Sequence, residues 1–461
     1  MGKNKGTDTT PRNSLSADSE VQRQKHIGDA VEHTEEVHID GEQSKFSAIL
    51  GILRKLIGVA DVINLRLSLP SQLLDPIPNL EYWNYMDSPE HFVAITEPDD
   101  EVERMLAMLA WWFSKLLKHT GKVHKPFNSV LGEQFFCKWE VDGNRSSAAS
   151  ATAQAATGSA SGNSSDAKRE DTAASSITNV SDGNGGSKLS VEYITEQVSH
   201  HPPVSAFVYR CKERGIEAVG MDHIAAKFTG LSATVATGSE CHGIFVTLKQ
   251  RNDEMYKCTH PVGSIVGWMR GTLKVQLIES SYIVCAKTGL AAIIEFKEER
   301  WFGKNKGNVT GKVFRYDEKA YGDKIAGWRL KDIPKTCTTV ATFGGNWDQK
   351  VMVERVDGAS KDSAERLLID MTALEPAEKQ VKPVEEQGEM ESRRIWGVVA
   401  SKMLEGKFGE ATRIKRGIED EQRALAAARK ERAEVVLPAL FKPGYSSNGK
   451  PELLDDAPIN I

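Results

Sequence analysis

The stretch LSVEYITEQVSHHPPVSAFVYRC, Leu189–Cys211, holds two strand-like runs on either side of a His-His-Pro-Pro corner. The two prolines fix φ and remove two backbone donors, so they should end the first strand. Similar short β-type runs continue to about Val353, and Gly, Asn, Asp or Pro lies between most of them. Because helical crossovers are missing, this pattern predicts one large antiparallel sheet. A sheet of so many strands should curl into a barrel wide enough to enclose a ligand cavity.

Helical patterns flank the predicted sheet. Asp100–His119 has an acidic start, a basic end and apolar residues around most of its circumference, which predicts a largely buried helix. Glu410–Glu434 is charged and should form an exposed helix on the surface of the sheet domain. Phe46–Ile57 carries a helical apolar stripe of only twelve residues, too short to span a bilayer. It is either a core helix, a mobile cover over a cavity, or a helix that lies at a membrane interface.

Two segments are predicted to be disordered. Residues 1–43 are polar with few large apolar side chains. Residues 143–187 are a low-complexity insert of Ser, Ala, Thr, Gly and Asn between the strand-like runs CKWEV and KLSVEYI. We interpret this insert as a long loop on one β-hairpin.

Composition excludes several classes of protein. Of 461 residues, 59 are basic and 64 acidic, so a nucleic-acid binder with its usual basic excess is not indicated. The six cysteines form no CxxC pair, which favours reduced core thiols over a disulfide or zinc framework. No run of about 18 apolar residues is present, so contact with a membrane should be peripheral. We expect a cytoplasmic protein.

The segment EQVSHHPP, Glu196–Pro203, is the first candidate for chemistry. Adjacent residues on a strand point to opposite faces, so His200 and His201 make a poor metal site. Adjacent positions also do not give Ser199 and His200 the geometry of a nucleophile pair. Two readings remain from the residues alone. The segment is a structural strand end, or the two imidazoles bind an anion with help from Lys or Arg elsewhere.

Two further sets of polar residues have a structural and a functional reading. In KPFNSVLGE, Lys125–Glu133, Lys125 and Asn128 either belong to an ordinary turn or reach a phosphate. Lys415, Glu419 and Arg423 share one helix face at a spacing of four residues. They form either a solvated salt-bridge ladder or a cationic clamp in which Glu419 holds its two neighbours in place and can accept a hydroxyl.

The octapeptide EQVSHHPP resembles the fingerprint of the oxysterol-binding-protein-related family. KPFNSVLGE, KTGLAAIIEF, FGGNWD and EEQGEMESRRIW resemble further family segments in the correct order. The likeness covers roughly Lys45 to Tyr445. The chain resembles the short, stand-alone sterol-transfer members known from fungi, and we expect no pleckstrin-homology domain or ankyrin repeats ahead of it.

The resemblance implies a headgroup site for phosphatidylinositol 4-phosphate. All seven residue types of the family's site are present, at Lys125, Asn128, His200, His201, Lys415, Glu419 and Arg423. At the tunnel floor, the helix end that supplies a glutamine and a tyrosine in sterol-transfer members reads His119 and Thr120 here, and Trp83 matches a tunnel-side tryptophan. The cargo implied is a sterol, with phosphatidylserine as the rival.

The resemblance also implies the fold and the activity. The fold class is mainly β with flanking helices (α+β), a large incomplete antiparallel β-barrel around a lipid tunnel. The expected divisions are a lipid-binding domain at 44–445, with a lid at 44–69 and a helical subdomain at 362–436, and a tail at 446–461. We expect a monomeric, non-enzymatic lipid exchanger without cofactor or metal, transiently membrane-associated. A sensor that binds lipid but rarely transfers it is the alternative.

Overall fold

A computed structural model describes residues 71–120, 123–143, 188–228, 233–267, 274–297, 307–322, 324–358, 364–444 and 449–461. The described strands form one connected antiparallel sheet, as predicted. Their bounds are β1 Gln134–Asp142, β2 Lys188–His200, β3 Pro203–Cys211, β4 Ile216–Phe228, β5 Ala233–Thr237, β6 Ile244–Leu248, β7 Glu254–Cys258, β8 Val262–Val266, β9 Lys274–Ile278, β10 Ser280–Cys285, β11 Leu290–Phe296, β12 Asn308–Arg315, β13 Thr338–Asn346, β14 Lys350–Arg355 and β15 Arg366–Asp370.

The sheet is curled but not closed. Its main path runs β1-β2-β3-β4-β6-β7-β10-β11-β12-β13-β14-β15, so β1 and β15 stand at its two ends. The long strand β4 pairs with β6 along its first half and with β5 along its second half. From β5 a branch continues through β8 to β9. This open antiparallel arrangement agrees with the predicted incomplete barrel.

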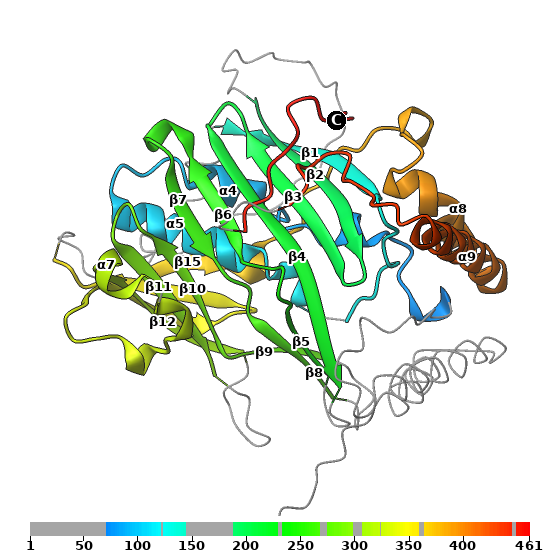
Figure 1. The fold of residues 1–461 in the computed structure, drawn as a ribbon. Coiled ribbons are helices and arrows are strands. Elements are labelled where there is room, and N and C mark those ends of the chain that lie inside the picture. Colours follow the sequence, from blue (N-terminus) through cyan, green and yellow to red (C-terminus); the bar gives the residue numbers. More distant parts are fainter. Residues whose placement is uncertain are drawn as a thin grey trace, which may run out of the picture.

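One face of the sheet, here called the inner face, is covered by helices. These are α3 Asn79–Tyr82, α4 Pro89–Ala94 and α5 Glu101–Ser114. The last two, α4 and α5, are labelled behind the strands in Figure 1. The α5 helix begins where Asp100 accepts a hydrogen bond from the Glu103 amide at 2.9 Å. Its buried residues join the large hydrophobic cluster of the inner face. The predicted helix at Asp100–His119 is thus confirmed, although its last turns are a separate 3₁₀ helix at Leu117–His119.

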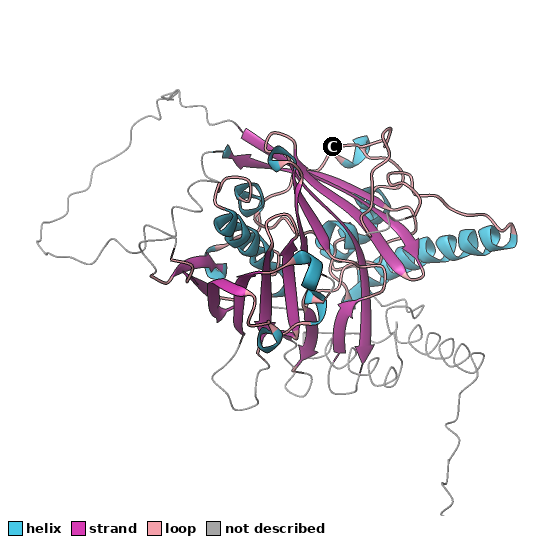
Figure 2. Cartoon of the chain, turned by 60° about the vertical axis from the view of Figure 1, so that its left-hand side comes forward, coloured by secondary structure: helices cyan, strands magenta, loops and turns pink. Residues whose placement is uncertain are grey.

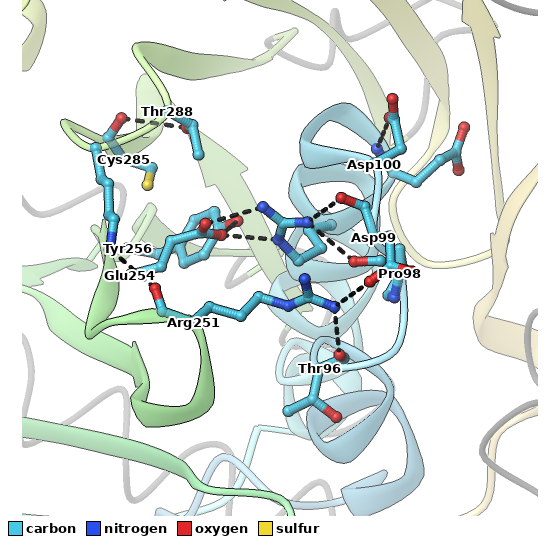
Figure 3. Close-up of polar contacts among 12 residues, drawn as sticks. Thr96, Pro98, Asp99, Asp100, Arg251, Glu254, Tyr256, Cys285 and Thr288 are labelled. Atoms are coloured by element: carbon cyan, nitrogen blue, oxygen red, sulfur yellow. Dashed lines mark hydrogen bonds and ion pairs between the residues drawn. The ribbon is translucent and has the colours of Figure 1, made fainter.

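A buried ion pair ties α5 to the sheet. The Arg104 guanidinium donates to both oxygens of Glu254 on β7, at 2.8 and 2.9 Å. Tyr256 donates a further hydrogen bond to Glu254 at 2.6 Å, and the two acceptors of Arg104 outside this pair are the carbonyl oxygens of Pro98 and Asp99 (Figure 3). Because the two buried charges are paired and hydrogen-bonded, the ion pair links α5 to β7.

The outer face of the sheet is covered by the end of the chain. Leu440 and Phe441 are buried there against strands β1 to β4 and β6. Leu453, Ile459 and Ile461 pack against the same cluster, and the C-terminal segment crosses β1, β2 and β3 in Figure 1. Residues 446–461 were predicted as a tail, yet their described part, 449–461, is packed onto the sheet.

The helical region follows the last strand. Its two long helices are α8 Ser392–Leu404 and α9 Phe408–Glu431, and α9 can be followed along its length in Figure 2. The helical pattern was expected to return at residue 362. Instead β15 extends the sheet at Arg366–Asp370, and α-helix begins again only at Ser392. A short helix, α7 Glu318–Tyr321, lies between β12 and β13.

Several predictions concern residues outside the described part of the chain: the segment at 1–43, the lid at 44–69, and all but the first residue of the insert at 143–187. The hairpin on which the insert sits is confirmed, because β1 and β2 pair in antiparallel register from Gln134↔Glu196 to Asp142↔Lys188. Among the described residues, no helix is both long enough and apolar enough to cross a membrane.

Candidate functional site

The loop KPFNSVLGE is anchored to α8 by an aromatic stack and a buried carboxylate. Phe127 and Trp396 are both buried, with ring centroids 5.3 Å apart. Glu133 accepts hydrogen bonds from the Ser392 hydroxyl at 2.7 Å, the Trp396 indole at 3.0 Å and the Val130 amide at 2.9 Å. Burial raises the pKa of Glu133 to about 7 against these donors. Two segments singled out in the sequence, KPFNSVLGE and EEQGEMESRRIW, therefore meet here.

This anchoring brings the loop's lysine close to α9. Lys125 lies within electrostatic range of both Lys415 and Glu419. Its ammonium donates to Asn128 Oδ1 at 2.6 Å, while Lys415, which is buried, donates to Glu419 Oε1 at 2.6 Å. Four of the seven predicted headgroup residues thus form one group, and a second carboxylate, Asp75, accepts the Lys125 amide at 2.6 Å.

The electrostatics of Lys125 suit an anionic ligand. Loss of hydration among packed atoms is the largest cause that lowers its pKa, to about 8, and the Lys415 charge is the next. Lys125 and Asn128 are nevertheless both exposed to solvent at the surface of the protein. Because Lys125 is exposed, a phosphate that approaches from solvent can reach its ammonium. An anion there would relieve the repulsion between the two lysines.

Arg423 lies further along α9 and is paired differently from expectation. Its guanidinium binds Asp420 on the same helix. Glu419 therefore pairs with Lys415, whereas Arg423 pairs with Asp420. Arg423 is exposed at the surface, with 42% of its side chain accessible.

The two histidines lie at the end of β2 and at the corner that follows it. Both are exposed, and their rings make an edge contact with centroids 4.6 Å apart. Three residues earlier, the Gln197 backbone exchanges hydrogen bonds with the KPFNSVLGE loop, to Gly132 at 2.9 Å and to Glu133 at 2.8 Å. The end of β2 and the loop are therefore neighbours in the fold.

The first residues of the EQVSHHPP segment have structural roles. The Glu196 carboxylate accepts the amides of Ala439 and Leu440, each at 2.8 Å, and so holds the C-terminal segment. The Gln197 side chain is fixed by hydrogen bonds to Ser199 and Ser205. The start of the segment is therefore structural, whereas its two histidines are exposed at the surface.

The structure brings together two of the three predicted tunnel residues. Trp83 stacks on His119 with ring centroids 5.6 Å apart. Burial, followed by the charges of Lys115 and Lys118, lowers the pKa of His119 to about 4, so its imidazole is neutral. The Thr120 hydroxyl donates to the Leu117 carbonyl at 2.7 Å.

Thr120 also lines a cavity of about 350 Å³. Tyr82, Leu117 and Trp139 contribute aromatic and aliphatic surface to its wall. The ion pair of Lys118 with Asp87 lies in the same wall, with both side chains largely buried. The size is within the usual range of small-molecule sites, although the wall is more polar than a simple hydrocarbon pocket.

The inner face also carries a group of ionisable residues that no sequence motif predicted. This interior cluster consists of Tyr85, Lys115, Asp222, Cys241 and His260. Tyr85 donates to Asp222 Oδ1 at 2.7 Å. Burial raises the pKa of Asp222 to about 7 and that of Cys241 to about 11, and it lowers the pKa of Lys115 to about 8. Only a lysine in the apolar run WWFSKLL hinted at this cluster.

The fold and the site define a ligand-binding protein, built on a curled antiparallel sheet with a cationic group where a loop meets a long helix. The chain belongs to the oxysterol-binding protein family, because the family model described as "Oxysterol-binding protein" matches residues 48–408. It is accordingly a lipid-binding protein of a non-enzymatic lipid-transfer family.

Curated relatives agree with this assignment. The chain is 36% identical to oxysterol-binding protein-like protein 1 of Schizosaccharomyces pombe, over 92% of this chain and 93% of that protein. It is 29% identical to human oxysterol-binding protein-related protein 11, over 88% of this chain but only 49% of the relative.

Solved structures share the fold. The ORD domain of Osh1, solved in complex with cholesterol, has a TM-score of 0.62 and 19% identity, and the match covers 89% of this chain and 87% of that one. The ORD of Osh3 from Saccharomyces cerevisiae, solved in complex with PI(4)P, has a TM-score of 0.56 and 16% identity, with 88% and 89% covered. The open antiparallel sheet described above is therefore the fold of these domains.

Proposed function

We propose that this protein extracts a sterol and phosphatidylinositol 4-phosphate from membranes and exchanges them through one shared hydrophobic tunnel. The observation that carries the proposal is the approach of Lys125 to Lys415 and Glu419, which joins a loop to a helix almost 300 residues later in the chain. Related ORD structures contain cholesterol, ergosterol or PI(4)P. Both ligand classes are therefore compatible with this fold.

In the proposed complex, the headgroup phosphates lie between the loop, the end of β2 and α9. Lys125 and Lys415 supply charge, and Asn128, His200 and His201 supply hydrogen-bond donors. Glu419 keeps Lys415 in place and can accept a hydroxyl of the inositol ring. Arg423 turns from Asp420 toward the ligand.

Exchange requires that the two cargos bind with comparable strength and exclude each other. Burial of about 400 Å² of sterol surface is worth roughly 10 kcal/mol at about 25 cal/mol per Å². This gain must approximate what the bilayer offers, or the sterol would never be released. A phosphoinositide gradient maintained by other enzymes would then drive the sterol in one direction. The protein carries out no covalent step.

The test is lipid extraction from liposomes by the wild type and by the double variant His200→Ala/His201→Ala. We expect the variant to lose extraction of phosphatidylinositol 4-phosphate and to retain much of its sterol extraction. Replacement of Lys125 by Ala should have the same selective effect. Equal loss of both activities in a folded protein would refute the separate headgroup site.

The cargo and the mode of action need their own measurements. Mass spectrometry of lipids that co-purify with the protein distinguishes a sterol from phosphatidylserine as the second cargo. Transfer between donor and acceptor liposomes distinguishes an exchanger from a sensor. A tight complex with negligible transfer would favour the sensor and contradict the exchange step.

A further inference from the structure

The interior cluster brings three potential metal ligands together from three segments. Asp222 is on β4, Cys241 is in the loop between β5 and β6, and His260 is in the loop between β7 and β8. One carboxylate oxygen, the thiol sulfur and one imidazole nitrogen all lie within 4.8 Å of one another. No other such group occurs in the described part of the chain.

The backbone around the cluster is held by hydrogen bonds. The Gly238 amide donates to the His223 carbonyl at 2.8 Å, and the Cys241 amide donates to the Gly238 carbonyl at 3.2 Å. These contacts fix the cysteine loop to β4 one residue beyond Asp222. The position of Cys241 beside Asp222 therefore follows from the main chain as well as from side-chain packing.

We propose that Asp222, Cys241 and His260 bind one divalent ion of the zinc class, with a fourth coordination position left for water or another ligand. Thiolate, imidazole and carboxylate are the three protein ligands that zinc prefers, and three of them with an open position is a common set. With metal–ligand bonds of about 2.0–2.3 Å, two ligand atoms at the 4.8 Å limit would move closer by roughly 1 Å.

An unsatisfied polar atom points independently to a missing ligand. His260 Nε2 is buried and has no hydrogen-bond partner among the described residues. Leaving such an atom unpaired costs about 1–3 kcal/mol, and coordination would remove this cost. The Tyr85 hydroxyl, which donates to Asp222 at 2.7 Å, is placed to orient the carboxylate in the manner of a residue that supports a metal ligand.

The charges of the cluster make a specific prediction about Lys115. A divalent ion with one thiolate, one carboxylate and a neutral imidazole has no net charge, which suits a buried position. The Lys115 ammonium lies 4.5 Å above the Trp112 ring and within electrostatic range of Asp222 and Cys241. This cation opposes a metal at the cluster. Its removal should therefore strengthen metal binding, whereas removal of a ligand should weaken it.

The experiment uses the untagged full chain, stripped with a chelator and titrated with Co²⁺ and then Zn²⁺. We expect one equivalent of Co²⁺ to produce a thiolate-to-cobalt charge-transfer band, which Zn²⁺ then removes. Cys241→Ser should abolish the band. Cys337→Ser, a buried cysteine outside the cluster, is the matched control and should leave it unchanged.

Two conservative variants test the rest of the arrangement. Tyr85→Phe should weaken zinc affinity about 10- to 100-fold, as expected for a residue that supports a ligand. Lys115→Met should increase it. Circular dichroism and the urea midpoint of the metal-free variants establish that they fold. Absence of the band, a band that survives Cys241→Ser, or unchanged affinity in Lys115→Met would overturn the proposal. Lipid extraction is a separate readout, so failure here leaves the proposed exchange function untouched.

Discussion

Phe127 and Trp396 stack with an interplanar angle of 26°, and this contact joins the KPFNSVLGE loop to α8. The stack belongs to a hydrophobic cluster that also contains residues of α9. One cluster therefore positions the loop that carries Lys125 and the helix that carries Lys415. The stability of this cluster and the geometry of the candidate headgroup site should change together.

Replacement of Phe127 by Ala tests this link. The ring is fully buried, so its loss should lower the free energy of unfolding by about 3–5 kcal/mol. The variant should also bind phosphatidylinositol 4-phosphate more weakly, because Lys125 loses its support. Urea denaturation and a liposome-binding assay measure the two effects. Phe127→Leu, which keeps much of the volume, should lose less of both. A cost below about 1 kcal/mol would contradict the assigned role of the stack.

Headgroup binding should depend on the protonation of Lys125. Its pKa is lowered to about 8, so the ammonium is present below this pH and is lost above it. Affinity for phosphatidylinositol 4-phosphate should therefore fall by up to roughly tenfold per pH unit above pH 8. Lys125→Arg keeps its charge throughout and should give a flat profile, although at lower absolute affinity. The same decline in both proteins would assign the effect to another group.

The strand pattern was predictable from the sequence because alternation and turn residues are local signals. They predicted the antiparallel sheet and the β1–β2 hairpin across the insert. The strand β15 was missed because RLLID is short and lies between charged segments. Its assignment depends on pairing with β14, a contact that no local pattern contains. The packing of residues 449–461 was missed for the same reason.

The candidate site shows a similar division. Segments with unusual chemistry, such as the histidines before two prolines, could be identified from the sequence. The role of Glu133 could not, because its donors Ser392 and Trp396 are about 260 residues away. The interior cluster was also not predictable. Asp222 and His260 each look like ordinary polar residues in or beside a strand until the fold brings them together.

The buried pair of Arg104 and Glu254 should be strongly coupled. Arg104→Met leaves the Glu254 carboxylate without its cation in the protein interior, which should cost about 3–5 kcal/mol in urea denaturation. The double variant Arg104→Met/Glu254→Met should recover a large part of this loss. Arg251 is a matched control visible in Figure 3, since its partner Asp99 is 98% exposed. Arg251→Met should cost less than about 1 kcal/mol. Additive single-variant effects would show that the pair is not coupled.

Glu133 should make stability fall as pH rises through the weakly acidic range. Its pKa in the folded protein is raised to about 7, whereas in the unfolded chain it is near 4.5. Between these two pKa values the folded state holds a proton that the unfolded state has lost, so raising the pH lowers the free energy of unfolding. Above about pH 7 Glu133 is ionised in both states, and its contribution no longer changes with pH. Glu133→Gln cannot titrate. The free energy of unfolding of Glu133→Gln, relative to that of the wild type, should therefore increase by up to roughly 3 kcal/mol between pH 5 and pH 7.5.

Differential urea denaturation of these two proteins cancels the titration of all other groups. Ser392→Ala provides a second check, because the Ser392 hydroxyl donates to Glu133 and favours its charged form. Without this donor, the midpoint of the pH dependence should move to a higher pH. A stability difference between Glu133→Gln and the wild type that stays constant from pH 5 to pH 7.5 would mean that Glu133 is ionised throughout. The three hydrogen bonds would then outweigh burial, and the loop would be held to α8 by a charged carboxylate.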